Sequence, residues 1–195
     1  MKKLLFPLTS ILLSVMLFCL MPTEAEAKIY EDTTRLHILA NSDDARDQEI
    51  KLAVRDALLL TYGEELSECA DADRDAFFGN RLDEIRDFVN AELASLGAPY
   101  SCEVSYGKEW YDTRVYDQFT LPKGVYTSLQ IKLGCAEGRN WWCVMYPPLC
   151  LDLATDAPRD DALLGYNTQE QSLIQNGRYQ VKFKALELLS SVFKK

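Results

Sequence analysis

The segment NWWCVMYPPLC contains two cysteines seven positions apart, Cys143 and Cys150. Their thiols are the side-chain groups of this sequence best suited to chemistry. A Cys and His hydrolase needs a thiolate held by an imidazole, and the sequence contains one histidine, His37, far from both cysteines. The sulfur spacing is not that of a zinc knuckle either. We therefore predict no metal site. Two interpretations stay open for the cysteines: a short disulfide or two buried thiols.

Other catalytic signatures are missing from the sequence. It contains no CxxC, HExxH or GxSxG motif and no phosphate loop. Carboxylates are plentiful, but no pair of them can be singled out for acid and base chemistry among so many solvated ones. We therefore predict that the protein is not an enzyme and that it uses no cofactor.

The N-terminal segment bears on whether the thiols can be oxidised, because disulfides form in exported proteins. Lys2 and Lys3 precede a largely apolar stretch over residues 4–20, and the AEA run that ends at Ala27 supplies small residues at a cleavage site. We predict a signal peptide over residues 1–27 and a secreted mature chain. An uncleaved membrane anchor is the alternative, since the apolar stretch is long for a signal core.

Five cysteines follow residue 27, so at least one thiol stays free. The most local pair is Cys143 with Cys150, and closing that loop would add about 2 kcal/mol of stability on the chain-entropy model. Cys102 and Cys135 form a second candidate pair if neighbouring strands bring them face to face.

Charge and length restrict the class of partner. The formal net charge is -9, from 21 basic against 30 acidic residues. Residues 28–97 hold most of the excess, with 8 basic residues against 17 acidic ones. An acidic surface repels phosphate, and no basic patch interleaved with aromatics is present, so we expect no nucleic acid partner. Residues 28–195 have the length of a single domain and contain no internal repeat or long linker.

The first elements of this domain can be predicted from side-chain periodicity. Side chains alternate over residues 34–40, which predicts a strand with Arg35 and His37 on the same side. Capping oxygens over residues 41–44 then predict a helix that ends before Gly63.

A second helical pattern covers residues 72–95, with Gly79 as a point of division and Gly97 as its stop. After Pro99 the residues become typical of strands, and a last amphipathic pattern over residues 179–193 predicts a terminal helix. The expected strands cover residues 100–106, 113–120, 125–133 and 141–145.

This order of elements predicts an α+β fold. We expect a single domain, built on an antiparallel sheet of about four to five strands with helices packed mainly on one face. The last strand should end near Met145, because Pro147 and Pro148 cannot continue an inner strand.

Polar side chains are unusually dense in the segment RLHILANSDDARDQEIKLAVRD, residues 35–56. A solvated surface would account for many of them. Together with LPKGVYTSLQIKLGCAEGRNWWCVMYPPLC, residues 121–150, this segment resembles the two signature regions of the stage II sporulation protein R family of endospore-forming bacteria. The two regions occur in the order that the family shows, and the expected signal peptide agrees with it.

The resemblance implies an intercellular signal of endospore formation. Such a protein is made in the forespore and exported to the space between forespore and mother cell. A membrane-embedded protease senses it there and processes the sigma-E precursor in the mother cell. The protein would then be a ligand that favours the active state of its protease through differential binding. Contact with a membrane would come only through that partner or through an uncleaved signal.

We hypothesise that polar side chains of the first segment join the tryptophan pair of the second as the contact surface for the protease. Trp and Arg are frequent anchors of interfaces. The alternative is that both segments serve folding, with the tryptophans in the core. The expected contact residues are Arg35, His37, Asn41, Gln48, Lys51, Arg55, Trp141 and Trp142.

Two other classes of function stay open. One is an exported cell-envelope enzyme that uses Cys143 or Cys150, and it would require a reactive free thiol. The other is a structural module of the cell envelope.

Overall fold

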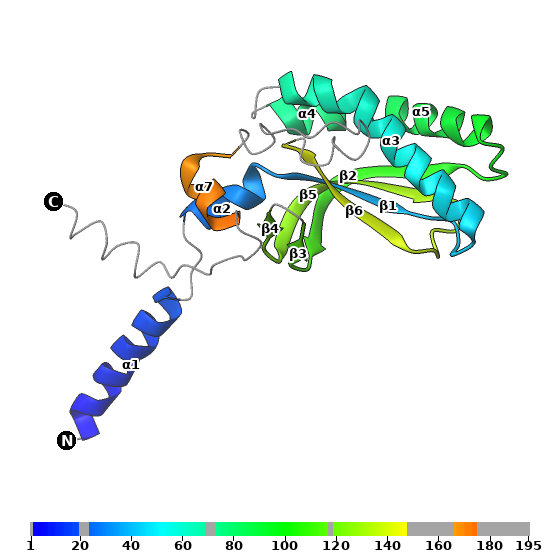
Figure 1. Cartoon of the computed structure of the whole chain (residues 1–195). Coiled ribbons are helices and arrows are strands. Elements are labelled where there is room, and N and C mark those ends of the chain that lie inside the picture. Colours follow the sequence, from blue (N-terminus) through cyan, green and yellow to red (C-terminus); the bar gives the residue numbers. More distant parts are fainter. Residues whose placement is uncertain (1, 20–23, 69–72, 117–118, 148–165, 175–195) are drawn as a thin grey trace.

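The computed structural model describes residues 2–19, 24–68, 73–116, 119–147 and 166–174. Figure 1 shows a sheet with a layer of helices on one side. The described elements are α1 (Lys2–Cys19), α2 (Glu24–Glu31), β1 (Thr34–Leu39), α3 (Ala45–Glu68), α4 (Arg74–Gly79), α5 (Leu82–Ser95), β2 (Cys102–Tyr111), β3 (Arg114–Val115), β4 (Thr120–Leu121), β5 (Gly124–Leu133), β6 (Asn140–Tyr146) and α7 (Thr168–Ile174).

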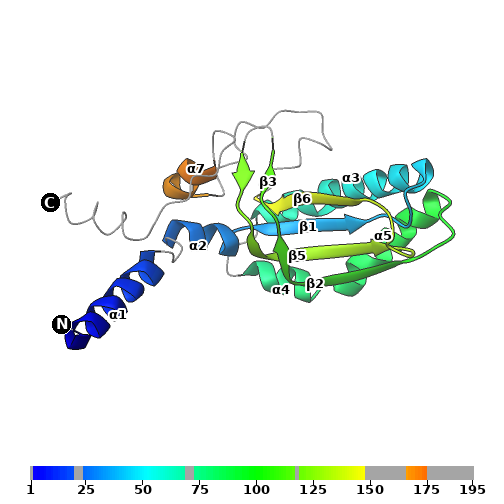
Figure 2. The same cartoon turned by 90° about the horizontal axis from the view of Figure 1, so that it is seen from below.

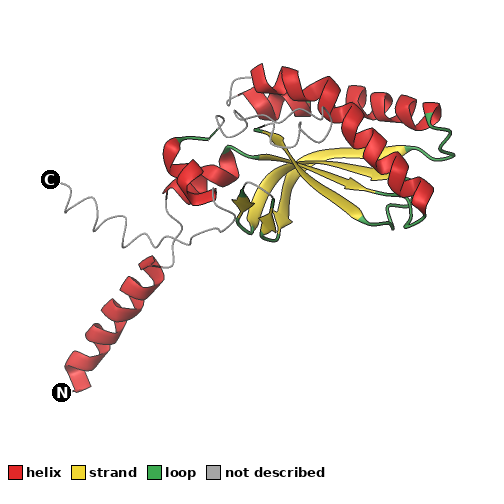
Figure 3. Ribbon diagram, in the orientation of Figure 1, coloured by secondary structure: helices red, strands yellow, loops and turns green. Residues whose placement is uncertain are grey.

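The main sheet has four strands in the order β2-β5-β1-β6, and β3 pairs with β4 in a small second sheet. The predicted α+β class is confirmed (Figure 3). The prediction of a purely antiparallel sheet is wrong, because β1 and β5 pair in parallel. A parallel pair needs a long crossover connection, and here the helices α3 to α5 and strand β2 provide it.

The helices α3, α4 and α5 cover one face of this sheet, as predicted. Figure 2 shows the sheet from its other side, where none of the described helices covers the four strands. Successive side chains of a strand point to opposite faces. Leu36 and Ile38 of β1 therefore face the helices, while Arg35 and His37 face away from them. The apolar core lies between sheet and helices and includes Leu36, Ile38, Ile50, Val54, Leu58, Ile85, Val89, Leu129 and Ile131.

Helix α3 is longer than the glycine pattern predicted. It continues through Gly63 to Glu68, so the predicted end before Gly63 is wrong. A glycine within a helix costs about 1 kcal/mol relative to alanine. The burial of Tyr62 and Leu66 on either side of it outweighs that cost. The predicted division at Gly79 is confirmed, because α4 ends there and α5 begins at Leu82.

The ends of the chain are described only in part. The expected signal peptide and its cleavage after Ala27 stay predictions, and that cleavage point lies within α2. Ile29, two residues later, is fully buried, and the Tyr30 hydroxyl donates a hydrogen bond to the carbonyl of Lys123. None of the helices that the structure describes combines the length and apolarity needed to cross a membrane. The terminal helix predicted over residues 179–193 lies outside the described residues.

The turn between β5 and β6 lies against the segment that joins β1 to α3. Gly138 donates its backbone N–H to the carbonyl of Ala40. A Cβ atom at Gly138 would lie 2.1 Å from the backbone oxygen of Ser42, a distance that no side chain can occupy without movement of the backbone. Glycine is therefore required at this position by close approach of two backbones.

We predict that Gly138→Ala lowers the free energy of unfolding by about 1–3 kcal/mol, the usual cost of an added group in a tightly packed site. Urea unfolding of the purified chain measures the change. The matched control is Gly79→Ala, since a Cβ at Gly79 has no atom within 4 Å. The control should change stability by less than about 0.5 kcal/mol. An equal loss in both variants would contradict the proposed contact.

Candidate functional site

The face of the main sheet that is not covered by α3, α4 and α5 is called the open face. Strand register places Arg35 beside Ser128, and His37 between Gln130 and Trp142. Neighbouring residues in register share a face. The hairpin of β3 and β4 folds over one end of this face (Figure 1).

Arg35 has its side chain completely buried on the open face. Its guanidinium carbon lies 4.4 Å from the ring centre of Tyr111 and 5.2 Å from that of Tyr126. The Nη2 atom donates a 2.9 Å hydrogen bond to the hydroxyl of Tyr116, which the β3–β4 hairpin supplies. Tyr111, Tyr116 and Tyr126 together are called the tyrosine cage below. The cage comes from β2, β5 and the hairpin, so the cation ties three separate parts of the chain to β1.

The charge of Arg35 has no carboxylate against it among the described residues, and its Nε and Nη1 atoms have no hydrogen-bond partner there. Removing a cation from water costs several kcal/mol even after the protein relaxes. Cation–π contacts with desolvated rings return about 2 kcal/mol or more. The tyrosine cage is therefore the main compensation that the described residues offer this charge.

His37 lies beside this cage. Its Nδ1 atom is 2.8 Å from Oε1 of Glu109, and the Nε2 of Gln130 donates to the same carboxylate oxygen at 3.1 Å. The imidazole stacks on the indole of Trp142 with ring centres 3.6 Å apart. Burial lowers the pKa of His37, and the nearby Glu109 carboxylate opposes that change only in part. Neutral imidazole is thus the favoured form in the fold.

A second group of predicted residues lies on the face that α3 covers. The Nζ of Lys51 donates to Oε1 of Gln48 at 2.6 Å and to the carbonyl of Arg139 at 3.0 Å. Arg55 places its guanidinium 4.4 Å from the ring centre of Trp141. Burial lowers the pKa of Lys51, and the charges of Arg139 and Arg55 act in the same direction.

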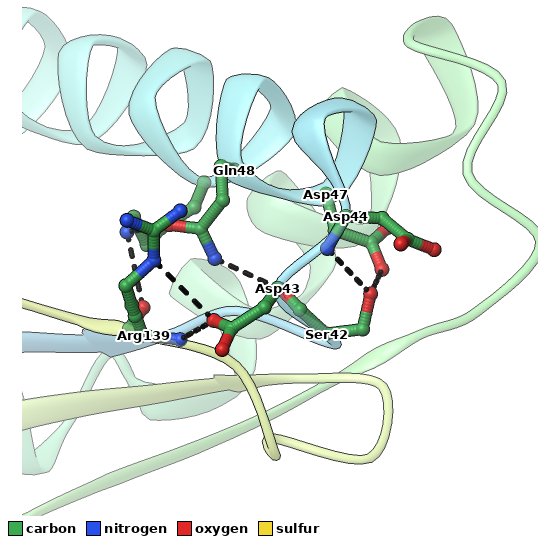
Figure 4. A network of polar contacts seen from close by, with 7 residues as sticks. Ser42, Asp43, Asp44, Asp47, Gln48 and Arg139 are labelled. Atoms are coloured by element: carbon green, nitrogen blue, oxygen red, sulfur yellow. Dashed lines mark hydrogen bonds and ion pairs between the residues drawn. The ribbon is translucent and has the colours of Figure 1, made fainter.

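The segment that joins β1 to α3 is fixed by a polar network (Figure 4). Ser42 donates its hydroxyl to Oδ2 of Asp47 at 2.6 Å and accepts the N–H of Asp44. Asn41 donates to the same Asp47 oxygen at 2.7 Å. These hydrogen bonds, led by that of Ser42, lower the pKa of Asp47. Asp43 accepts the N–H of Arg139 at 2.7 Å, which ties the β5–β6 turn to the same point.

The structure therefore separates the predicted contact residues instead of gathering them on one surface. Arg35, His37 and Trp142 share the open face, while Gln48, Lys51, Arg55 and Trp141 meet between β6 and α3, and Asn41 lies in the connecting network. Four of the eight residues are almost fully buried: Arg35, His37, Lys51 and Arg55. A direct contact of any of the eight with a partner stays a prediction.

Cys143 and His37 do not form a catalytic pair. Cys143 is in register with Leu36 and so faces the helices, whereas His37 lies on the open face. Cys150 lies outside the described residues, so a disulfide with Cys143 stays a prediction.

The second candidate disulfide is wrong, because Cys102 and Cys135 are both free thiols. Burial raises the pKa of Cys102 to about 11, so its thiol stays protonated at neutral pH. No cluster of metal-binding side chains is found among the residues that the structure describes.

A shallow pocket of about 180 Å³ opens on the open face beside Glu109 and Gln130, the partners of His37. The sequence pattern did not predict it. It forms where small residues of β2 and β5, Gly107 and Ser128, are in register on the open face. The short side chains of Ser105 and Gly107 in an alternating strand were the signal that could have indicated it. The lining residues are Ser105, Tyr106, Gly107, Lys108, Glu109, Ser128 and Gln130.

Comparison with known proteins identifies the family. The model of the family described as stage II sporulation protein R matches residues 30–156, which include β1 to β6 and all residues of both groups above. The chain belongs to the stage II sporulation protein R family. The resemblance of its two signature regions is thereby confirmed.

A curated relative in this family is stage II sporulation protein R of Bacillus subtilis (strain 168). It is 35% identical over 125 residues, which cover 63% of this chain and 55% of the relative. The matched region thus spans about half the length of that relative. No solved structure matches the chain. The family name assigns the protein to stage II of sporulation.

The contacts of Arg35 with the tyrosine cage predict the order of stability of its variants. We predict that Arg35→Lys lowers the free energy of unfolding by about 2 kcal/mol or more, because a lysine keeps the buried charge but cannot lie flat on the rings. Arg35→Met should cost less, since it keeps much of the volume and removes the charge. Urea unfolding at one pH measures both. A methionine variant less stable than the lysine variant would refute this account of the cage.

Burial of His37 predicts a pH dependence of stability. The folded protein holds the imidazole neutral below its ordinary pKa of 6.5, whereas the unfolded chain takes up the proton. Stability therefore declines as the pH falls from about 7.5 to about 5.5, by about 1.4 kcal/mol at most for each unit by which the pKa is lowered.

Urea unfolding across this range should show the decline in the wild type and a flatter profile in His37→Gln. Since His37 is the only histidine of the chain, no other imidazole contributes. Parallel profiles for the two proteins would show that His37 is not the group responsible.

Proposed function

We propose that this protein is a secreted signal of endospore formation that activates a membrane-embedded protease, which then processes the sigma-E precursor in the mother cell. The finding that carries the proposal is membership of the stage II sporulation protein R family over residues 30–156. The proposed place of action is the space between forespore and mother cell, reached through the expected export signal over residues 1–27.

The geometry of the two signature regions supports a binding role. The first region contributes β1 and the start of α3, and the second contributes β5 and β6, so both regions meet in adjacent strands. His37 of the first region contacts Gln130 of the second and Glu109 of β2, and Lys51 donates to Gln48 within the first region. Such side chains hold a surface in shape, which reduces the ordering cost of binding a partner.

Activation then requires only differential binding. A ligand that binds the active state of a protease more tightly than the inactive state shifts the equilibrium toward activity. A shift from about 1% to about 99% active requires about 10⁴-fold tighter binding to the active state. The chemistry of cleavage belongs to the protease in this scheme, and the present chain supplies the free energy of binding.

A disulfide between Cys143 and Cys150 is part of this proposal, since it would fix the end of β6 after export. The competing proposal is an exported envelope enzyme that uses Cys143 or Cys150. A pairing of Cys143 with His37 gains no support, because these two side chains lie on opposite faces of the sheet. A structural module of the envelope would bind envelope material and would not depend on a protease.

The decisive test is reconstitution in a host that does not sporulate. We predict that co-expression of the full chain with the protease and the sigma-E precursor yields the cleaved precursor, followed by immunoblot. Cleavage should vanish when residues 1–27 are deleted, because the ligand then stays on the wrong side of the membrane. An unrelated export signal in place of residues 1–27 should restore it.

Two controls make the outcome specific. A protease with its catalytic residues inactivated should leave the precursor intact, and a folded but unrelated exported domain should not trigger cleavage. If the exported chain is present and a control signal shows the protease to be functional, an intact precursor would refute the proposed function.

A further inference from the structure

Strand β2 forms one edge of the main sheet, and no other strand among the described residues pairs with its outer side. It pairs with β5 over ten consecutive residues without a bulge, and it contains no proline. Native edge strands are usually protected by bulges, prolines or short length, because their free N–H and C=O groups can pair with another chain. A long and regular edge of this kind is a template for an added strand.

The pocket of about 180 Å³ lies along this same edge, at Gly107. A cavity of about 150 Å³ is enough for a benzene ring. Glycine at position 107 is not needed for the fold, since a Cβ there would have no atom within 4 Å and the backbone is not in the left-handed region. Its missing side chain leaves room on the open face for one ring-bearing side chain from an added strand.

An apolar pair marks the other side of the edge. Trp110 of β2 is 60% exposed and is in register with Val125 of β5, which is 46% exposed. Residues 107 and 110 are three positions apart, so their side chains lie on opposite faces. Two side chains of an added strand, opposite positions 107 and 110, would therefore reach the pocket on one face and Trp110 on the other.

Charges along the edge define the partner further. Glu103 and Lys108 are exposed, and within the described residues neither has an opposite charge in contact. Opposite charges on directly facing residues of two strands stabilise the pair. In an antiparallel addition the incoming segment would carry an acidic residue opposite Lys108 and a basic one opposite Glu103.

We propose that the outer edge of β2 binds an extended segment of the partner protease as a fifth strand of the sheet. In antiparallel order this segment reads apolar, any residue, acidic, aromatic, with a basic residue four positions after the aromatic one. The aromatic side chain occupies the pocket at Gly107, and the apolar one packs on Trp110. The assignment of the partner rests on the proposed function.

The pocket is continuous with the network around His37. Glu109 and Gln130 both line the pocket and bind the imidazole. A side chain in the pocket would thus lie against Glu109 and Gln130, which His37 of β1 holds in place. This arrangement gives the buried residues of the first signature region a positioning role for the edge.

The test is Gly107→Phe in the full chain, measured in the reconstitution with the protease and the sigma-E precursor. The new ring fills the pocket from the protein's own side and excludes that of the partner. We expect the rate of precursor cleavage to fall at least about tenfold, the loss typical of a buried interface anchor. The matched control is Gly79→Phe, the same change at an open position in the helix layer, which should cleave at the wild-type rate.

Three further measurements keep the result interpretable. Urea unfolding checks that Gly107→Phe is folded, and Trp110→Ser, at an exposed position, should reduce cleavage by itself. A photo-crosslinking residue at position 110 should form an adduct with the protease. Wild-type cleavage by folded Gly107→Phe, or an adduct with a second copy of this chain in place of the protease, would overturn the proposal.

Failure of the proposed function has a different signature. In that case the wild-type chain itself gives no cleavage and no adduct with the protease, and the assignment of the protease segment to β2 falls with it. Cleavage by the wild type with normal cleavage by both Gly107→Phe and Trp110→Ser would refute only the edge-strand interaction.

Discussion

The burial of one positive charge governs how the open face is built. Arg35 is fully buried on β1 and meets no carboxylate among the described residues, so ring faces must compensate for its lost water. Those rings come from β2, β5 and the β3–β4 hairpin. The hairpin therefore has to fold over the end of the sheet, and β5 has to lie beside β1. The parallel pair at the centre of the fold is consistent with this requirement.

Two separate groups of polar side chains lie on the two sides of β1, and they have different structural roles. On the open face, His37, Trp142 and Glu109 pack together beside the pocket. On the helix side, Lys51 and the network of Asp47 hold α3 to the β5–β6 turn. His37 and Lys51 are almost fully buried and hydrogen-bonded, so they position the surface around them. A segment dense in polar groups therefore does not form one exposed ridge in this fold.

Periodicity predicted the local elements well and their arrangement less well. The strand over residues 34–40 and the division at Gly79 follow from side-chain spacing, which is a local property. The extension of α3 through Gly63 depends on tertiary burial of Tyr62 and Leu66. The parallel pairing of β1 with β5 depends on a contact between residues about ninety positions apart, as His37 with Gln130 shows. The separation of Trp141 from Trp142 follows directly from strand alternation once the strand is known.

The sequence singled out the polar residues of the first signature region but did not predict where they lie in the fold. The density of polar residues in the first signature region indicated a special role, and the structure assigns that role largely to internal support. The edge of β2 escaped notice because nothing in a sequence marks a strand as an edge; only the strand order does. Gly107 shows the same limit. A lone glycine in a strand indicates a bulge or a close backbone approach, and here the register is regular and the space around it is empty. No backbone requirement of the described residues therefore accounts for glycine at position 107.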